Sequence, residues 1–271
     1  MPELPEVETT RRGLAPHLVN RSIVDVICRV PKLRLPLDPF LPRLLSGQTV
    51  LTLERRGKYL LLGCNDGTLL IHLGMTGHLR IFAANTPPDK YDHFELTMDD
   101  GRLLRLSDPR KFGIVTWISG DPHAHPLLYG LGPEPLENDF TGDYLHQQTR
   151  RRQSAIKLVL MDNRVVVGVG NIYANESCFL MGINPATPAR ELTKTACARA
   201  AAMVREVLQE AIARGVATLN DYVDSSGTPT YFRLQPAVYG REGEPCPTCS
   251  SAIRRSLLAG RSTYWCPTCQ L

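Results

Sequence analysis

The sequence predicts an α+β protein with a β-rich first half and a helical second half. Short apolar or alternating segments, many of them separated by turn residues, fill residues 22–118. Beyond residue 141 the hydrophobic period becomes that of a helix. Two Cys-x-x-Cys pairs then lie near the end of the chain. We therefore expect an N-terminal β-sandwich, a helical domain and a small C-terminal ribbon.

Composition limits the class of protein. The chain has 271 residues, of which 43% are hydrophobic and 21% charged, as is typical of a globular protein with one large or two ordinary domains. We expect a cytoplasmic protein, because no apolar run has membrane-spanning length and no charged-then-apolar leader is present. The net charge of +4 is uneven, with −2 over residues 1–149 and +6 over residues 150–271. A basic second half is compatible with a polyanionic partner.

The elements of the first half follow from periodicity and turn residues. A helix is expected over residues 6–18, ending near Gly13 to Pro16, and a short helical pattern over 39–45 interrupts the strands. Asn-Asp-Gly at 65–67 and Asp-Asp-Gly at 99–101 are turn signals between strands. The expected strands are 22–30, 50–56, 59–64, 68–73, 78–82, 93–98, 102–107 and 113–118. Strands of this number and spacing predict a sandwich or a barrel.

The second half is predicted to be helical. Residues 119–141 are rich in Pro, Gly and Asp, which indicates a linker. Helices are expected over 171–181 and over 193–214, the latter ending at Gly215, and residues 215–239 predict a mobile loop. The predicted domains are a β-sandwich over 1–130, a linker over 131–149, a helical domain over 150–237 and a ribbon over 238–271.

The strongest single motif is a pair of cysteine knuckles. Cys246 and Cys249 form the first, and after sixteen residues Cys266 and Cys269 form the second. This spacing predicts one tetrahedral zinc ion, which fits a cytosolic chain better than disulfides do. Four thiolates leave no open coordination position, so the zinc is expected to be structural. A ribbon this small needs the metal to fold.

The first residues permit a covalent chemistry. If Met1 is removed, Pro2 presents a secondary amine, and an α-amino group titrates near pH 8, so part of it is unprotonated at neutral pH. Such an amine can attack the C1′ atom of a sugar and form an iminium ion. Glu3 beside it could transfer protons. The alternative is a proline that only opens the first helix.

The first nine residues, Met-Pro-Glu-Leu-Pro-Glu-Val-Glu-Thr, resemble the start of the bacterial formamidopyrimidine-DNA glycosylases, and the resemblance extends over the whole chain. It implies a base-excision-repair enzyme that removes oxidised purines, such as 8-oxoguanine and formamidopyrimidine, and then cleaves the strand by β- and δ-elimination. Pro2 matches the nucleophile of the family and Glu3 its general acid/base. Lys58 matches a lysine that assists β-elimination, and Arg261 an arginine implicated in δ-elimination.

The resemblance also implies contacts with duplex DNA. Residues matching Met75, Arg110 and Phe112 fill the space left by the extruded base, and the arginine pairs with the orphaned cytosine. Lys157 and Asn171 match residues that contact backbone phosphate, and Asn171 lies in the region that the family calls a helix–two-turns–helix element. We further expect a phosphate contact by Arg152. Either Tyr91 or His93 is expected to touch DNA, and the sequence leaves this choice open.

Two other functions compete with this interpretation. The related endonuclease VIII branch removes oxidised pyrimidines, but it typically has Gly where this chain has Leu4, and Met75 and the 110–112 loop also favour the purine branch. The second competitor is a non-catalytic zinc-ribbon protein that only binds DNA. We expect a monomer that carries one structural zinc ion.

Overall fold

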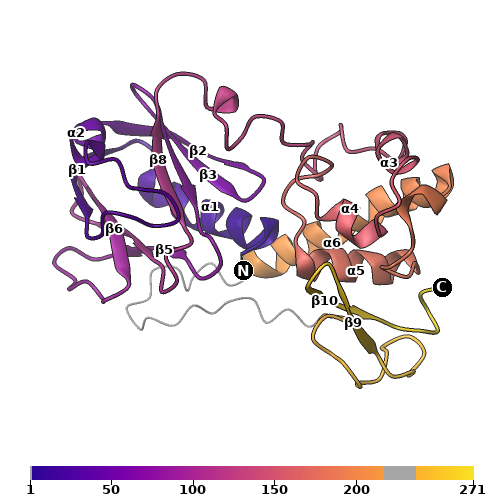
Figure 1. Cartoon of the computed structure of the whole chain (residues 1–271). Helices are drawn as coiled ribbons and strands as arrows, with labels where there is room; N and C mark the ends of the chain where they lie inside the picture. The colour runs from indigo at the N-terminus through magenta and orange to yellow at the C-terminus, as the bar shows by residue number, and fades with distance from the viewer. Residues whose placement is uncertain (1, 217–235) are drawn as a thin grey trace. The chain divides into compact units, whose positions relative to one another are not determined.

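The structure is a computed structural model that describes residues 2–216 and 236–271 (Figure 1). The chain divides into two compact units, which are described separately. One comprises Met1–Tyr129 with Ile212–Phe232, and the other comprises Gly130–Ala211 with Arg233–Leu271. None of the helices in the described ranges is long and apolar enough to cross a membrane.

The first unit begins with helix α1 (Leu4–Leu18). Its apolar face, which includes Leu4, Leu14 and Leu18, is fully buried. The helix was expected to end near Gly13 to Pro16, but it continues to Leu18. A proline in the last turn removes only one helical hydrogen bond, and the burial of Leu18 compensates for that loss.

Eight strands form one continuous hydrogen-bonded series in the order β5-β7-β6-β1-β2-β3-β4-β8. Each corresponds to an expected strand. They are β1 (Arg21–Cys28), β2 (Thr49–Arg56), β3 (Tyr59–Cys64), β4 (Thr68–His72), β5 (His78–Phe82), β6 (Asp92–Met98), β7 (Leu103–Ser107) and β8 (Ile114–Ile118). The series divides at β1, whose first two residues pair with β2 and whose remainder, after a bulge, pairs with β6.

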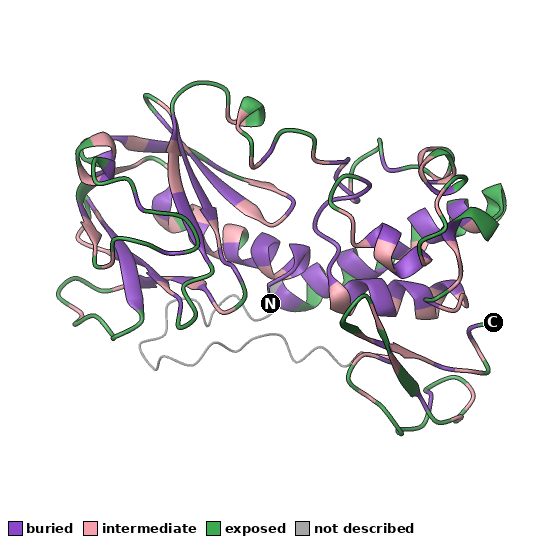
Figure 2. Ribbon diagram, viewed as in Figure 1, coloured by how far each residue is buried: buried purple, intermediate pink, exposed green. Residues whose placement is uncertain are grey.

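Both halves of the series face one core. Leu60 and Leu62 of β3 and Leu104 and Leu106 of β7 lie in the same cluster of buried side chains. The short helix α2 (Leu41–Leu45) adds Leu41 and Leu45 to it. Figure 2 colours much of these strands purple, which marks buried residues. The expected β-sandwich is confirmed.

The second unit is helical, as expected. Its helices are α3 (Gly142–Thr149), α4 (Ile156–Leu160), α5 (Asn171–Met181) and α6 (Lys194–Val216), of which α6 continues into the first unit. Helix α3 lies inside the stretch predicted as a linker. Gly182 ends α5 with a φ of +70°, and the Ile183 N–H bonds back to the Cys178 carbonyl, which is a Schellman-type end.

The ribbon is a two-stranded hairpin within the second unit. Strands β9 (Arg254–Leu258) and β10 (Arg261–Trp265) pair antiparallel, with Arg261 opposite Leu258 and Trp265 opposite Arg254. Ala259 and Gly260 form the turn, both with positive φ. This turn presents Arg261 at the tip of the hairpin.

Candidate active site and zinc centre

The predicted catalytic pair lies at the start of α1. Pro2 is buried, and Glu3 is only 2% exposed. The Glu3 backbone N–H donates to a Glu6 carboxylate oxygen at 2.8 Å, as in a helix capping box. These residues are therefore fixed against the first turn of the helix, whereas chain ends commonly fray.

A buried glutamate connects α1 to the hairpin that carries Lys58. The Glu8 carboxylate accepts hydrogen bonds from Arg11 at 2.8 Å, Arg12 at 2.7 Å and Arg55 at 3.0 Å. Arg55 also donates to the carbonyl of Gly57, the residue before Lys58, at 3.0 Å. Burial alone would raise the pKa of Glu8, but hydrogen bonds from Arg11 and Arg12 and the charge of Arg55 lower it to about 2. Sequence reasoning missed this link.

His72 is a second residue that sequence reasoning missed. Its ring lies 4.8 Å from that of Tyr59, and its Nδ1 accepts the Gly74 N–H at 3.0 Å. A neutral ring with Nδ1 as acceptor carries its proton on Nε2. Burial, with the charges of Lys58 and Arg34, lowers the pKa of His72 to about 4. The ring is therefore a neutral N–H donor at neutral pH, within the field of Lys58.

Met75, Arg110 and Phe112, which are expected to fill the space left by the extruded base and are here called the wedge residues, lie on two exposed loops. Met75 and Phe112 are each 41% exposed. The Arg110 guanidinium lies 4.6 Å from the centroid of the Phe112 ring, within cation–π range. The loop thus presents a cation and an aromatic ring together.

The structure separates Tyr91 from His93. His93 is 3% exposed, and its Nε2 lies 3.0 Å from the carbonyl oxygen of Asp108, so its ring is part of the fold. Tyr91 is 38% exposed, and the Lys90 ammonium lies 4.7 Å from the centroid of its ring. Of the two residues, only Tyr91 presents its side chain to a ligand.

In the second unit, Lys157 and Asn171 meet strand β10. Lys157 is fully buried, and its ammonium donates to the Ser262 carbonyl at 2.9 Å and to the Thr263 hydroxyl at 2.7 Å. The Asn171 amide donates to the same Ser262 carbonyl at 3.0 Å. The ammonium is enclosed in this structure, and its bonds hold the residues next to Arg261. The phosphate contact that the resemblance implies for Lys157 stays a prediction.

Arg152 lies apart from this cluster. Its guanidinium pairs with Asp162 at 3.0 Å, and its side chain is 36% exposed. A surface ion pair of this kind contributes little stability, so the guanidinium can exchange partners.

The four predicted zinc ligands converge. The Sγ atoms of Cys246, Cys249, Cys266 and Cys269 all lie within 4.8 Å of one another. The Cys249–Cys266 and Cys246–Cys269 sulfur distances are 3.4 and 3.9 Å, close to the separation of about 3.8 Å in a tetrahedron with Zn–S bonds of about 2.3 Å. The backbone N–H groups of Thr248 and Cys269 point at sulfurs, each at 3.4 Å. The set fits one structural zinc ion.

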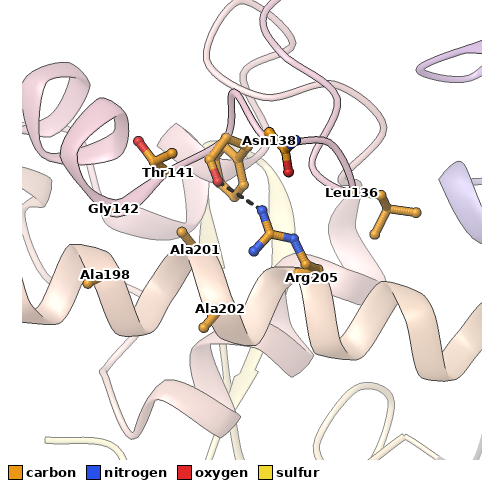
Figure 3. Close-up of a pocket in the computed structure, with 9 residues that line it drawn as sticks. Leu136, Asn138, Thr141, Gly142, Ala198, Ala201, Ala202 and Arg205 are labelled. Carbon is orange, nitrogen blue, oxygen red and sulfur yellow. Dashed lines mark hydrogen bonds between the residues drawn. The ribbon is translucent and has the colours of Figure 1, made fainter.

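An open hollow lies elsewhere in the second unit. It has a volume of about 550 Å³ and is lined mainly by alanines of α6 and by residues 136–142 (Figure 3). Arg205 is its one charged residue, and this guanidinium already donates to the carbonyls of Glu137 and Phe140, both at 3.2 Å. None of the predicted site residues lines this hollow.

Comparisons with known proteins find matches along the whole chain. Residues 1–115 match the formamidopyrimidine-DNA glycosylase N-terminal domain, residues 131–223 the H2TH domain of the same enzymes, and residues 243–271 the zinc finger found in FPG and IleRS. The formamidopyrimidine-DNA glycosylase of Geobacter sulfurreducens is 54% identical over 270 residues, which cover 100% of both chains. The chain belongs to the formamidopyrimidine-DNA glycosylase family.

Solved structures of formamidopyrimidine-DNA glycosylases are similar to this chain over nearly its whole length. The MutM (Fpg) protein of Thermus thermophilus is 40% identical, with a TM-score of 0.85 over 99% of this chain and 98% of that one. Lactococcus lactis Fpg in complex with abasic-site DNA is 32% identical, with a TM-score of 0.87 over 99% of each chain.

Membership of the formamidopyrimidine-DNA glycosylase family confirms the predicted class of function. The chain is a base-excision-repair glycosylase for oxidised purines with AP lyase activity, it binds DNA, and it carries a four-cysteine zinc finger. The mobile loop expected over 215–239 falls, for residues 217–235, outside the described part of the chain.

Proposed function

We propose that Pro2, which becomes the N-terminal residue once Met1 is removed, is the nucleophile of this glycosylase and that Glu3 is its general acid/base. The observation that carries the proposal is the fixed position of Pro2 and Glu3 at the start of α1, which Glu8 and Arg55 connect to the turn before Lys58. Preorganised groups do not have to be ordered again in the transition state.

The reaction that follows from this assignment has two stages. The Pro2 nitrogen bonds to C1′ as the C1′–base bond breaks, and the amine proton neutralises the departing base. The C1′–O4′ bond then opens, Glu3 protonates O4′, and a C1′=N iminium forms. The resulting iminium acidifies the C2′ proton. Loss of that proton expels the 3′ phosphate in β-elimination, and a second elimination expels the 5′ phosphate. Lys58 assists the first of these eliminations and Arg261 the second.

The DNA contacts are assigned in the same way. Met75, Arg110 and Phe112 fill the gap left by the extruded nucleotide, and Tyr91, not His93, contacts DNA beside them. Asn171 and Arg261 bind phosphate, and Arg152 does so by exchanging Asp162 for a phosphate oxygen. His72 donates its Nε2–H to a phosphate near Lys58. A chain of this kind is expected to act as a cytoplasmic monomer, which light scattering of the purified protein would check.

Borohydride trapping tests the nucleophile. A duplex with 8-oxoguanine opposite cytosine should yield a covalent adduct that maps to the N-terminal peptide, and intact mass should show that Met1 is absent. Pro2→Gly should lose most of the adduct, whereas Lys58→Arg should keep it. An adduct that maps to Lys58 or to any internal lysine would overturn the assignment. A thymine glycol duplex should be a poorer substrate than the 8-oxoguanine duplex.

A further inference from the structure

The two wedge loops cross the same gap between the halves of the sandwich. One joins β4 to β5 and carries Met75, and the other joins β7 to β8 and carries Arg110 and Phe112. Strand β4 pairs with β8 and β5 pairs with β7, so the loops start and end side by side. The register makes this explicit, because His72 lies opposite Ile114 and His78 lies opposite Ser107.

A buried carboxylate joins the two loops. Asp108 has no solvent exposure, and one of its carboxylate oxygens accepts the Thr76 hydroxyl at 2.6 Å while the other accepts the Gly113 N–H at 2.7 Å. The Arg110 N–H points at both the Thr76 hydroxyl oxygen and Asp108, each at 3.3 Å. The Thr76 hydroxyl therefore donates to one residue of the second loop and accepts from another.

The loop backbones also touch directly. Gly74 has a φ of +65°, and a Cβ atom built there would lie 2.4 Å from the carbonyl carbon of Phe112 and 2.6 Å from its oxygen. No side chain fits at this point, so the close approach requires glycine. The two loops thus pack as one body with Asp108 at its centre.

A base wedge works best when it is rigid. Unstacking a base step costs on the order of a few kcal/mol, and a loop that must first be ordered adds its own entropy cost to that sum. Loops fixed before they meet DNA avoid the second cost. The same rigidity sets the distance between the Arg110 guanidinium and the two apolar side chains that flank it.

We propose that Asp108 and Thr76 are positioning residues that lock the Met75 loop to the Arg110–Phe112 loop, and that this lock sets how strongly the enzyme distinguishes cytosine from adenine opposite the lesion. The inference rests on the proposed wedge role of Met75, Arg110 and Phe112. Neither Asp108 nor Thr76 contacts the reacting atoms. They act through the geometry of the arginine and the wedge.

The test compares Thr76→Val with Thr76→Ser. Valine keeps the shape of threonine and removes the hydroxyl, while serine keeps the hydroxyl. The measurement is the single-turnover rate of 8-oxoguanine excision opposite cytosine divided by the rate opposite adenine. Any loss of folded protein cancels in this ratio. Thr76→Val removes a hydrogen bond to a carboxylate, so we expect it to lower this ratio roughly tenfold. Thr76→Ser should keep the wild-type ratio.

The outcomes separate the inference from the proposed function. Arg110→Ala is measured in parallel. If it leaves the ratio unchanged, the wedge assignment fails. If Arg110→Ala lowers the ratio but Thr76→Val keeps it at the wild-type value, the lock is wrong and the wedge stands. Asp108→Asn keeps only one side-chain acceptor oxygen where the loops use two, so it should lower the ratio at least as far as Thr76→Val does. Because Asp108 is buried, this variant could misfold, and the comparison of Thr76→Val with Thr76→Ser is therefore the deciding test.

Discussion

Within the described residues, the core of the β-sandwich contains 25 buried side chains, whereas that of the ribbon contains four, and two of those four are zinc-ligand cysteines. The sandwich can be stable by burial alone. The ribbon must depend on its metal and on what packs against it. The chain offers a separate reporter for each region, because its two tryptophans are Trp117 in β8 and Trp265 in β10.

Removal of the metal should separate the two regions most clearly. Structural zinc sites contribute on the order of 10 kcal/mol to the folding of small modules. Cys266→Ser or a strong chelator should therefore unfold the ribbon and reduce DNA affinity by more than roughly a hundredfold. In a Trp117→Phe background the fluorescence of Trp265 should change, and in a Trp265→Phe background that of Trp117 should not. Simultaneous loss of both signals would show that the sandwich depends on the zinc.

The largest effect expected in the sandwich comes from Glu8. Glu8→Gln leaves Arg55 and its neighbours without a buried counter-charge, and breaking such a pair costs about 3–5 kcal/mol. Urea unfolding followed through Trp117 measures the change. Glu54→Gln on the exposed side of the same hairpin is the matched control, and it should stay within about 0.5 kcal/mol of wild type.

The same glutamate predicts a pH dependence. The folded-state pKa of Glu8 is about 2, below its ordinary value of 4.5. A lowered carboxyl pKa stabilises the fold above the ordinary value, and that stability is lost as the pH falls from about 4.5 towards 2. The Glu8→Gln variant should lack this part of the acid transition. An identical acid transition in wild type and variant would contradict the ion-pair account.

Substitution of Lys157 tests whether its ammonium makes a structural hydrogen bond or a contact with DNA. Lys157→Met should loosen β10 and weaken DNA binding, because the Thr263 hydroxyl loses the ammonium donor and the Ser262 carbonyl keeps only the Asn171 amide. A lysine that neutralised a phosphate would also contribute about one unit to the salt dependence of binding. We expect the slope of log Kd against log salt to be unchanged in Lys157→Met and reduced by about one in Arg261→Ala. A reduced slope in Lys157→Met would support the phosphate contact that the resemblance implies.

Local patterns predicted the parts of the molecule that short-range geometry determines. All eight strands follow from alternation and turn residues, and the α5 helix ends before Gly182, whose positive φ stops it. The zinc site follows from the spacing of its knuckles. In each case the residues that make the feature lie close together in the sequence.

Long-range bonds escaped prediction for the opposite reason. Lys157 meets Thr263, which lies 106 residues further along the chain, and Thr76 meets Asp108 across 32 residues. No periodicity records such a pairing. The burial of His93 and the exposure of Tyr91 depend likewise on how β6 packs. One sequence cue for Lys157 existed, because it lies within the otherwise apolar run of residues 156–160.

The smallest effect is expected at Glu176, a half-buried glutamate of the second unit. Its carboxylate accepts three backbone N–H groups, from Ala237 at 2.7 Å, Val238 at 3.1 Å and Tyr239 at 2.8 Å. Burial raises its pKa, although these hydrogen bonds and the charge of Arg241 lower it in part. The charged form is thus costly to bury here, whereas three guanidinium groups make it favourable at Glu8.

Glu176→Gln should therefore change stability at neutral pH by less than about 1 kcal/mol, because the loss of a hydrogen bond from a backbone N–H and the removal of a half-buried charge offset each other. Urea unfolding followed through Trp265 in the zinc-loaded protein measures this, with Glu244→Gln as the exposed control. A raised carboxyl pKa makes the charged form cost stability at neutral pH, and this cost vanishes as the pH falls through the folded pKa. A loss as large as that of Glu8→Gln would mean that backbone N–H groups stabilise a buried carboxylate as well as guanidinium groups do, and the contrast between the two regions would fail.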